Sequence, residues 1–154
     1  LKEINPSGTF ITSIVGSYNL KSDVIEIANA GHQPAILRKE NNFTEFPSSS
    51  APLAVIKQKN IDVYKLETFK LDGGRVYCFT DGFSECLDEN KKEIGIDGVK
   101  ELIKKHKNSS LKTELENAAE EIRKKSLKKN HNEKGIKENN YILDDDLTII
   151  GIGR

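Results

Sequence analysis

The sequence contains no methionine and no tryptophan, and only two of its 154 residues are cysteine. Because the chain begins with Leu1 rather than with methionine, we expect it to be part of a longer protein. The two thiols, Cys78 and Cys86, occur close together in one segment. Their spacing suits neither a zinc knuckle nor a disulfide framework, so we expect two reduced thiols in a cytoplasmic protein.

The chain also lacks net charge and long apolar runs. Lys and Arg together number 24, as do Asp and Glu, so the formal net charge is zero. This balance excludes a general attraction to nucleic acid or to an anionic membrane. No apolar run approaches the ~20 residues of a membrane helix, and nothing at Leu1 resembles a signal peptide. A chain of this length fits one domain, which would bury roughly 70% of its unfolded surface.

The first two thirds of the chain have the pattern of β structure. A turn at residues 21–23 follows the first strand and indicates an antiparallel hairpin. Residues 43–52 are rich in Ser and Pro and predict a loop. Alternating, β-branched and aromatic residues predict strands at residues 9–19, 24–29, 35–38, 61–71 and 75–80.

After this region the apolar period changes to that of helices. Residues 99–103 predict a short helix that Asp97 could cap, and residues 111–122 carry one apolar stripe after Ser110, a second candidate cap. Residues 128–140 have almost no apolar content and predict a mobile connector. Residues 147–152 predict a last strand, so the sum is an α+β domain.

Carboxylates occur where two of these predicted strands end or begin. Asp81 follows one strand, and the run of Asp144, Asp145 and Asp146 precedes the last. If these strands are antiparallel neighbours, the carboxylates meet at one sheet edge and repel each other unless a cation lies among them. Mg²⁺ and Mn²⁺ prefer such oxygen ligands. The alternatives are a simple Asp-Gly turn at Asp81 and an exposed acidic loop before the last strand.

Five short motifs occur in one order along the chain. They are Ala-Gly-His-Gln-Pro at residues 30–34, Pro-Leu at 52–53, Thr-Asp-Gly at 80–82 followed by Ser-Glu, Ile-Gly at 94–95, and Asp-Asp-Leu-Thr at 145–148. This order resembles the catalytic domain of PPM-type metal-dependent serine/threonine phosphatases, in the stage II sporulation protein E branch. The resemblance implies an αββα sandwich with a centre of two or more Mn²⁺ or Mg²⁺ ions. It also implies hydrolysis of phosphoserine or phosphothreonine in a protein by a metal-activated water.

The resemblance assigns roles to particular residues. Asp81 and Asp145 match the metal ligands of the family and are the expected catalytic residues. Asp146 either adds a metal ligand or forms only a turn hydrogen bond. The expected substrate is a phosphorylated anti-sigma-factor antagonist in bacterial signalling, and the parent chain is expected to carry an upstream sensor domain.

Three further residues are expected to support the site. Thr80 would hold the loop by hydrogen bonding, and Gly82 would let the chain leave the strand tightly. The pKa range of histidine would suit His32 to general-acid catalysis, but a single histidine in a Gly-His-x-Pro turn is more often a structural hydrogen-bonder.

The sequence also departs from the family pattern. The family's first metal-binding Asp is absent from residues 1–8, and so are its N-terminal strands and helices. Gln33 and Ala54 stand where Pro and Gly are usual. We therefore expect residues 1–154 to be the C-terminal two thirds of a phosphatase domain, weakly active or inactive alone. The alternatives are a catalytically inactive pseudo-phosphatase that serves as a regulatory binding module, and a fragment that oligomerises through open sheet edges.

Overall fold

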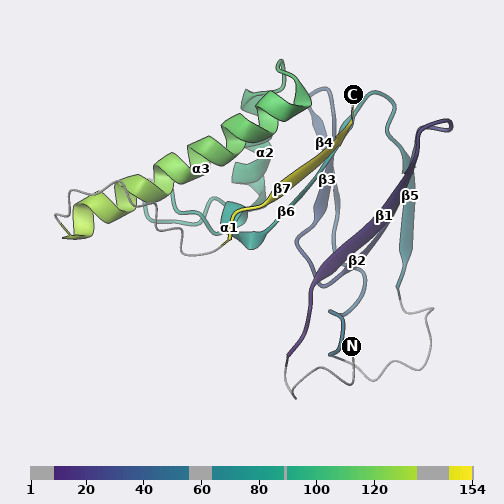
Figure 1. Ribbon diagram of the computed structural model, residues 1–154, viewed down its shortest axis with the longest axis horizontal. Helices are drawn as coiled ribbons and strands as arrows, with labels where there is room; N and C mark the ends of the chain where they lie inside the picture. Colours follow the sequence, from purple (N-terminus) through teal and green to yellow (C-terminus); the bar gives the residue numbers. More distant parts are fainter. Residues whose placement is uncertain (1–8, 56–63, 89, 135–145, 154) are drawn as a thin grey trace. The chain divides into compact units, whose positions relative to one another are not determined.

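The computed structural model describes residues 9–55, 64–88, 90–134 and 146–153, with side chains omitted at residues 126–134. The described chain divides into two compact units. Unit 1 holds the residues up to Cys78 together with Gly153, and unit 2 holds the residues from Phe79 to Ile152. Each unit is described by itself below, with the elements labelled in Figure 1.

The first sheet of unit 1 contains β1 (Ser13–Asn19), β2 (Val24–Ala30) and β5 (Leu66–Lys70). β2 lies in the middle and pairs antiparallel with both neighbours (Figure 1). The turn between β1 and β2 suits its residues, because the Asn19 side chain accepts two backbone N–H bonds and Asp23 has a φ of 57°. The predicted hairpin is therefore confirmed. Residues 61–63, the start of the strand predicted at 61–71, lie outside the described residues.

The second sheet places β3 (Ala35–Lys39) between β4 (Asn42–Phe46) and β6 (Arg75–Phe79), again antiparallel. β4 corrects the prediction of a loop at residues 43–52. Ser and Pro dominate only from Pro47 onward, whereas the residues before it are mostly β-prone and pair with β3 from Ala35↔Phe46 to Lys39↔Asn42.

The two sheets of unit 1 face each other across an apolar core. The rings of Phe46 from β4 and Phe69 from β5 stack with centroids 4.2 Å apart, so one sheet's side chains reach the other's. The buried apolar residues of the strands and the turn after β5 are Ile25, Ile27, Ala30, Ala35, Ile36, Leu37, Leu71, Val76 and Tyr77.

Unit 2 consists mainly of helices. They are α1 (Asp81–Ser84), α2 (Gly95–Lys105) and α3 (Leu111–Lys134), followed by β7 (Ile149–Gly153), whose last residue belongs to unit 1. α3 runs beside α2 in Figure 1. The absence of a side chain at Gly151 of β7 leaves room for α3, because a Cβ there would lie 2.8 Å from Leu111 Cδ1.

One of the two predicted helix caps is confirmed. Ser110 Oγ accepts the N–H of Thr113 at 3.2 Å, as an N-cap side chain does. Asp97 does not cap α2, because the helix already begins at Gly95 and Ile94 is the N-cap. Asp97 instead forms an ion pair with Lys100 at 2.9 Å within the first turns.

The prediction of a mobile connector at residues 128–140 is wrong for its first part, because α3 continues to Lys134. A segment with few apolar residues gains little free energy from burial, but it can still be helical, because Lys, Asn, His and Glu are all tolerated in a helix. Extending an existing helix also costs less free energy than nucleating a new one. Residues 135–140 lie outside the described residues. Across the described residues, no helix combines the length and the apolar character that a membrane crossing requires.

Candidate phosphatase site

Asp81 is held where β6 passes into the short helix α1. Thr80 is the N-cap of that helix, and the carbonyl of Asp81 accepts the N–H of Glu85 at 2.8 Å. Phe83 is buried and packs edge-on against Phe79 with ring centroids 6.3 Å apart, which anchors α1. Asp81 is therefore the first residue of a helix rather than a residue of an isolated turn.

The carboxylate of Asp81 is half-buried and, in the described part of the chain, makes no hydrogen bond or ion pair. Partial burial of a carboxylate costs free energy unless a donor or a cation compensates it. The side chain is therefore available to a ligand.

The hydroxyl of Thr80 joins this strand end to the chain that enters β7. Thr80 Oγ1 donates to the carbonyl of Asp146 at 2.8 Å and accepts the N–H of Thr148 at 3.0 Å. The backbone N–H of Thr80 donates to the carbonyl of Thr148, also at 3.0 Å. The residue after β6 and the residues before β7 therefore lie side by side. This is the arrangement in which carboxylates from the two strand ends could meet, as expected from the sequence. Thr80 has the predicted supporting hydrogen bonds.

Asp81 follows Thr80 directly in the chain, and the backbone carbonyl of Asp146 accepts a hydrogen bond from the Thr80 hydroxyl. The structure therefore brings the backbones of Asp81 and Asp146 to neighbouring positions. Asp146 is exposed. Asp144 and Asp145 lie outside the described residues, so the expected pair of Asp81 and Asp145 stays a prediction. Among the described residues, no three His, Cys, Asp or Glu side chains form a group that could hold a metal ion.

Gly82 does not have the backbone conformation that would require glycine. Gly82 is the second residue of α1, and its φ is not positive. In this it differs from Gly31, Gly73 and Gly95, which do have a positive φ. A left-handed exit from the strand is therefore not the reason for glycine at this position.

His32 lies in unit 1, in the turn between β2 and β3. The ring atom Nδ1 of His32 is 3.0 Å from Thr12 Oγ1. The backbone N–H of His32 donates to Asn29 Oδ1 at 2.9 Å. The preceding Gly31 has a φ of 69°, and a Cβ there would lie 2.3 Å from Pro52 Cγ. These contacts agree with a structural histidine in a tightly built turn, and a role in acid catalysis stays a prediction.

Cys78 is unsuited to thiolate chemistry. Burial raises the pKa of its thiol, which favours the protonated form. Neither Cys78 nor Cys86 forms a disulfide bond within the described part of the chain. Sequence reasoning did not identify Thr148 as the partner of Thr80, although its place at the start of the last strand was a usable signal.

Comparison with known proteins identifies relatives of the whole chain. The family model described as "Stage II sporulation protein E (SpoIIE)" matches residues 1–154. The chain is 25% identical over 147 residues to the phosphoserine phosphatase RsbU of Bacillus subtilis. The aligned region covers 94% of this chain but only 39% of RsbU. The chain thus spans about two fifths of the curated relative it matches.

Solved structures show the fold. The SiaA-PP2C domain of Pseudomonas aeruginosa superposes with a TM-score of 0.74 at 14% identity, covering 99% of this chain and 55% of that one. The RsbU and RsbW domains of a Mycobacterium tuberculosis protein superpose with a TM-score of 0.61 at 17% identity. This match covers 93% of the present chain and 36% of the Mycobacterium tuberculosis chain. The predicted α+β class, with two antiparallel sheets in the arrangement of PP2C phosphatases, is therefore confirmed.

Proposed function

Because the chain belongs to the stage II sporulation protein E family, we propose that it is part of a metal-dependent serine/threonine phosphatase domain. Such a domain hydrolyses phosphomonoesters on a protein substrate. The observation that carries the proposal is the half-buried, unpaired carboxylate of Asp81, which Thr80 holds beside the Asp146 segment. The phosphoserine phosphatase relative supports the same chemistry.

The residues present fit a hard divalent cation. Asp81 supplies an uncompensated carboxylate, and the backbone of Asp146, a second candidate ligand, is bonded to the adjacent Thr80. Asp145 would add the third oxygen ligand expected from the family. When bound, two or more Mn²⁺ or Mg²⁺ ions supply positive charge to the phosphoryl oxygens and activate water. The protein's own part is to hold the backbone at Asp81 beside the backbone at Asp146, which the Thr80 hydroxyl does through its two bonds to the residues before β7.

The finer assignments are also proposals. We expect the substrate to be a phosphorylated anti-sigma-factor antagonist, since RsbU is a phosphoserine phosphatase. We also expect a sensor domain upstream in the parent chain and a location in the cytoplasm. The alternative is an inactive pseudo-phosphatase that binds a regulator.

The two candidates are separated by Mn²⁺ binding and Mn²⁺-dependent hydrolysis of a phosphoserine peptide, measured on the full-length protein that contains this chain. We expect Asp81→Asn to lower kcat by about 100-fold or more, because it removes negative charge that holds the cations. Asp97→Asn is the matched control, since Asp97 lies on α2, is 93% exposed and is paired with Lys100 rather than assigned to the site. Normal activity in Asp81→Asn would refute the assignment, and a wild-type protein that binds no Mn²⁺ would favour the pseudo-phosphatase.

A further inference from the structure

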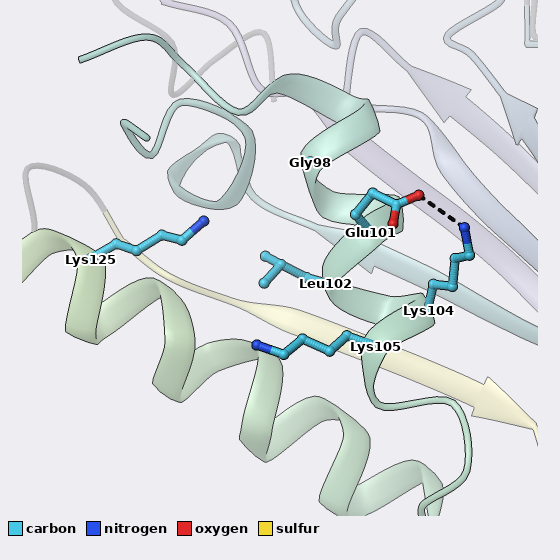
Figure 2. A pocket seen from close by; sticks show the side chains of 6 residues that line it. All are labelled: Gly98, Glu101, Leu102, Lys104, Lys105 and Lys125. Carbon is cyan, nitrogen blue, oxygen red and sulfur yellow. Dashed lines mark hydrogen bonds and ion pairs between the residues drawn. The ribbon is translucent and has the colours of Figure 1, made fainter. Parts of the chain in front are cut away.

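A hollow of about 450 Å³ lies between α2 and α3 in unit 2. We call it the lysine hollow, because three of its six lining residues are lysine (Figure 2). Its residues are Gly98, Glu101, Leu102, Lys104, Lys105 and Lys125. In Figure 2, Lys105 extends from α2 toward α3 and Lys125 extends from α3 toward α2, with Leu102 between them.

The three lysines differ in their partners. Lys104 pairs with Glu101 at 3.2 Å, and Lys105 pairs with Glu121 at 2.7 Å. Lys125 is half-buried and, within the described part of the chain, forms no hydrogen bond or ion pair. The lining therefore carries three ammonium groups and one carboxylate, with Lys125 uncompensated.

Lys125 differs from the other basic residues of α3 whose side chains the structure describes. Lys112 lies 3.8 Å from Glu116, Arg123 lies 4.0 Å from Glu120, and Lys124 lies 3.6 Å from Glu120. An ammonium that has no neighbouring anion attracts a carboxylate more strongly than an ammonium that is already paired, because nothing nearby offsets its charge.

The shape of the hollow decides the kind of ligand. Sites for small molecules bury most of the ligand's surface. Here the side chains of Lys104 and Lys105 are 45% and 62% exposed, so a small anion would remain largely in water. A segment that presents several carboxylates gains more, because one carboxylate can pair with Lys125 while others in the same complex reach the partly exposed ammonium groups of Lys104 and Lys105, which can share a second anion.

We propose that the lysine hollow binds the carboxylates of an Asp/Glu-rich segment of a partner protein, with Lys125 as the principal contact. This surface contains none of the residues assigned to the phosphatase site. The inference goes beyond the proposed function and does not depend on metal binding.

The test is fluorescence anisotropy with a labelled polyglutamate peptide and with polyglutamine of the same length, on this chain and on the full-length protein. We expect binding of polyglutamate only, weakening as ionic strength rises from about 0.02 M to about 0.3 M. Lys125→Gln should raise Kd about three- to tenfold, whereas Lys125→Arg, which keeps the charge, should restore most of the affinity.

Lys112→Gln is the matched control, because Lys112 lies on the same helix, is 84% exposed and does not line the hollow. We expect it to change Kd by less than about twofold. Equal losses in Lys112→Gln and Lys125→Gln would overturn the proposal, since they would indicate unspecific attraction. Absence of polyglutamate binding would also overturn the proposal. So would displacement of the peptide by inorganic phosphate when the concentration of negative charge from phosphate equals that from the peptide, because a small anion would then bind as well as the carboxylate segment.

Discussion

At the scale of single residues, the Thr80 side chain has the clearest task. Its hydroxyl is both donor and acceptor to a segment 66 and 68 residues further along the chain. Valine has nearly the same shape but can do neither. We therefore expect Thr80→Val to destabilise the protein by about 1 kcal/mol, the usual net value of a hydrogen bond, and to weaken Mn²⁺ binding by displacing the Asp146 segment.

The measurement is Tm with and without Mn²⁺, because a ligand that binds only the folded state raises Tm by an amount that grows with the logarithm of its concentration divided by Kd. Thr80→Ser keeps the hydroxyl and should retain the Mn²⁺-dependent rise, whereas Thr80→Val should lose most of it. If both variants respond to Mn²⁺ like the wild type, Thr80 has no positioning role.

At the scale of secondary-structure elements, a polar cluster connects α2 to α3. Glu121 Oε1 of α3 lies 2.7 Å from Lys105 Nζ and 2.8 Å from Nε2 of His106, the residue that ends α2. Burial raises the pKa of Glu121, but hydrogen bonds from Lys105 and His106, and their charges, outweigh it, so the pKa lies below its usual value.

This direction predicts how stability depends on pH. A carboxyl whose pKa is lower in the folded state contributes stability above its unfolded pKa, about 4.3, and loses it as pH falls through the folded pKa. Glu121→Gln should therefore cost roughly 1 kcal/mol, or about 3 °C in Tm, at pH 7. The difference from wild type should shrink as the solution is acidified below about pH 4.

Thermal unfolding followed by circular dichroism across this pH range provides the measurement. Glu116→Gln is the control, because Glu116 is on the same helix, 63% exposed and 3.8 Å from Lys112. It should change Tm little at any pH. A Glu121→Gln deficit that is equally large at low pH would show that packing, not the charge, is responsible.

The elements themselves could be predicted only where local signals are strong. The β1–β2 hairpin and the Ser110 cap follow from turn and capping residues that act on their own neighbours. Glu114 shows the limit, because it is fully buried although glutamate is a residue type that is mostly exposed in folded proteins. It lies three residues after Leu111 and four before Ala118, so helical spacing places it in the apolar stripe.

At the scale of the whole molecule, one face of the β1-β2-β5 sheet exposes apolar side chains. Val15 and Leu66 are 67% and 58% exposed, and both are paired in register with Ala28 of β2. A contiguous exposed apolar row promotes association. We expect this chain to self-associate at high concentration, and the double variant Val15→Thr/Leu66→Thr to reduce this, since threonine keeps strand propensity.

Sedimentation velocity over a range of concentrations would measure that association. Lys70→Thr is the control, because Lys70 is an exposed residue of β5 that is not apolar. An unchanged association in the double variant would exclude this face, and the open sheet edges would then be the surface to examine.

The α+β class follows from the apolar period of local segments of the sequence, and the family resemblance follows from the order of the short motifs between residues 30 and 148, so neither requires the packed fold. The tertiary structure alone decided that the Thr80 hydroxyl bonds Asp146 and Thr148, and that Glu121 holds Lys105 and His106. It also left Lys125 without a partner in the described part of the chain. Such pairings depend on how helices and strands far apart in sequence pack together, and packing is a property of the whole fold rather than of any local segment.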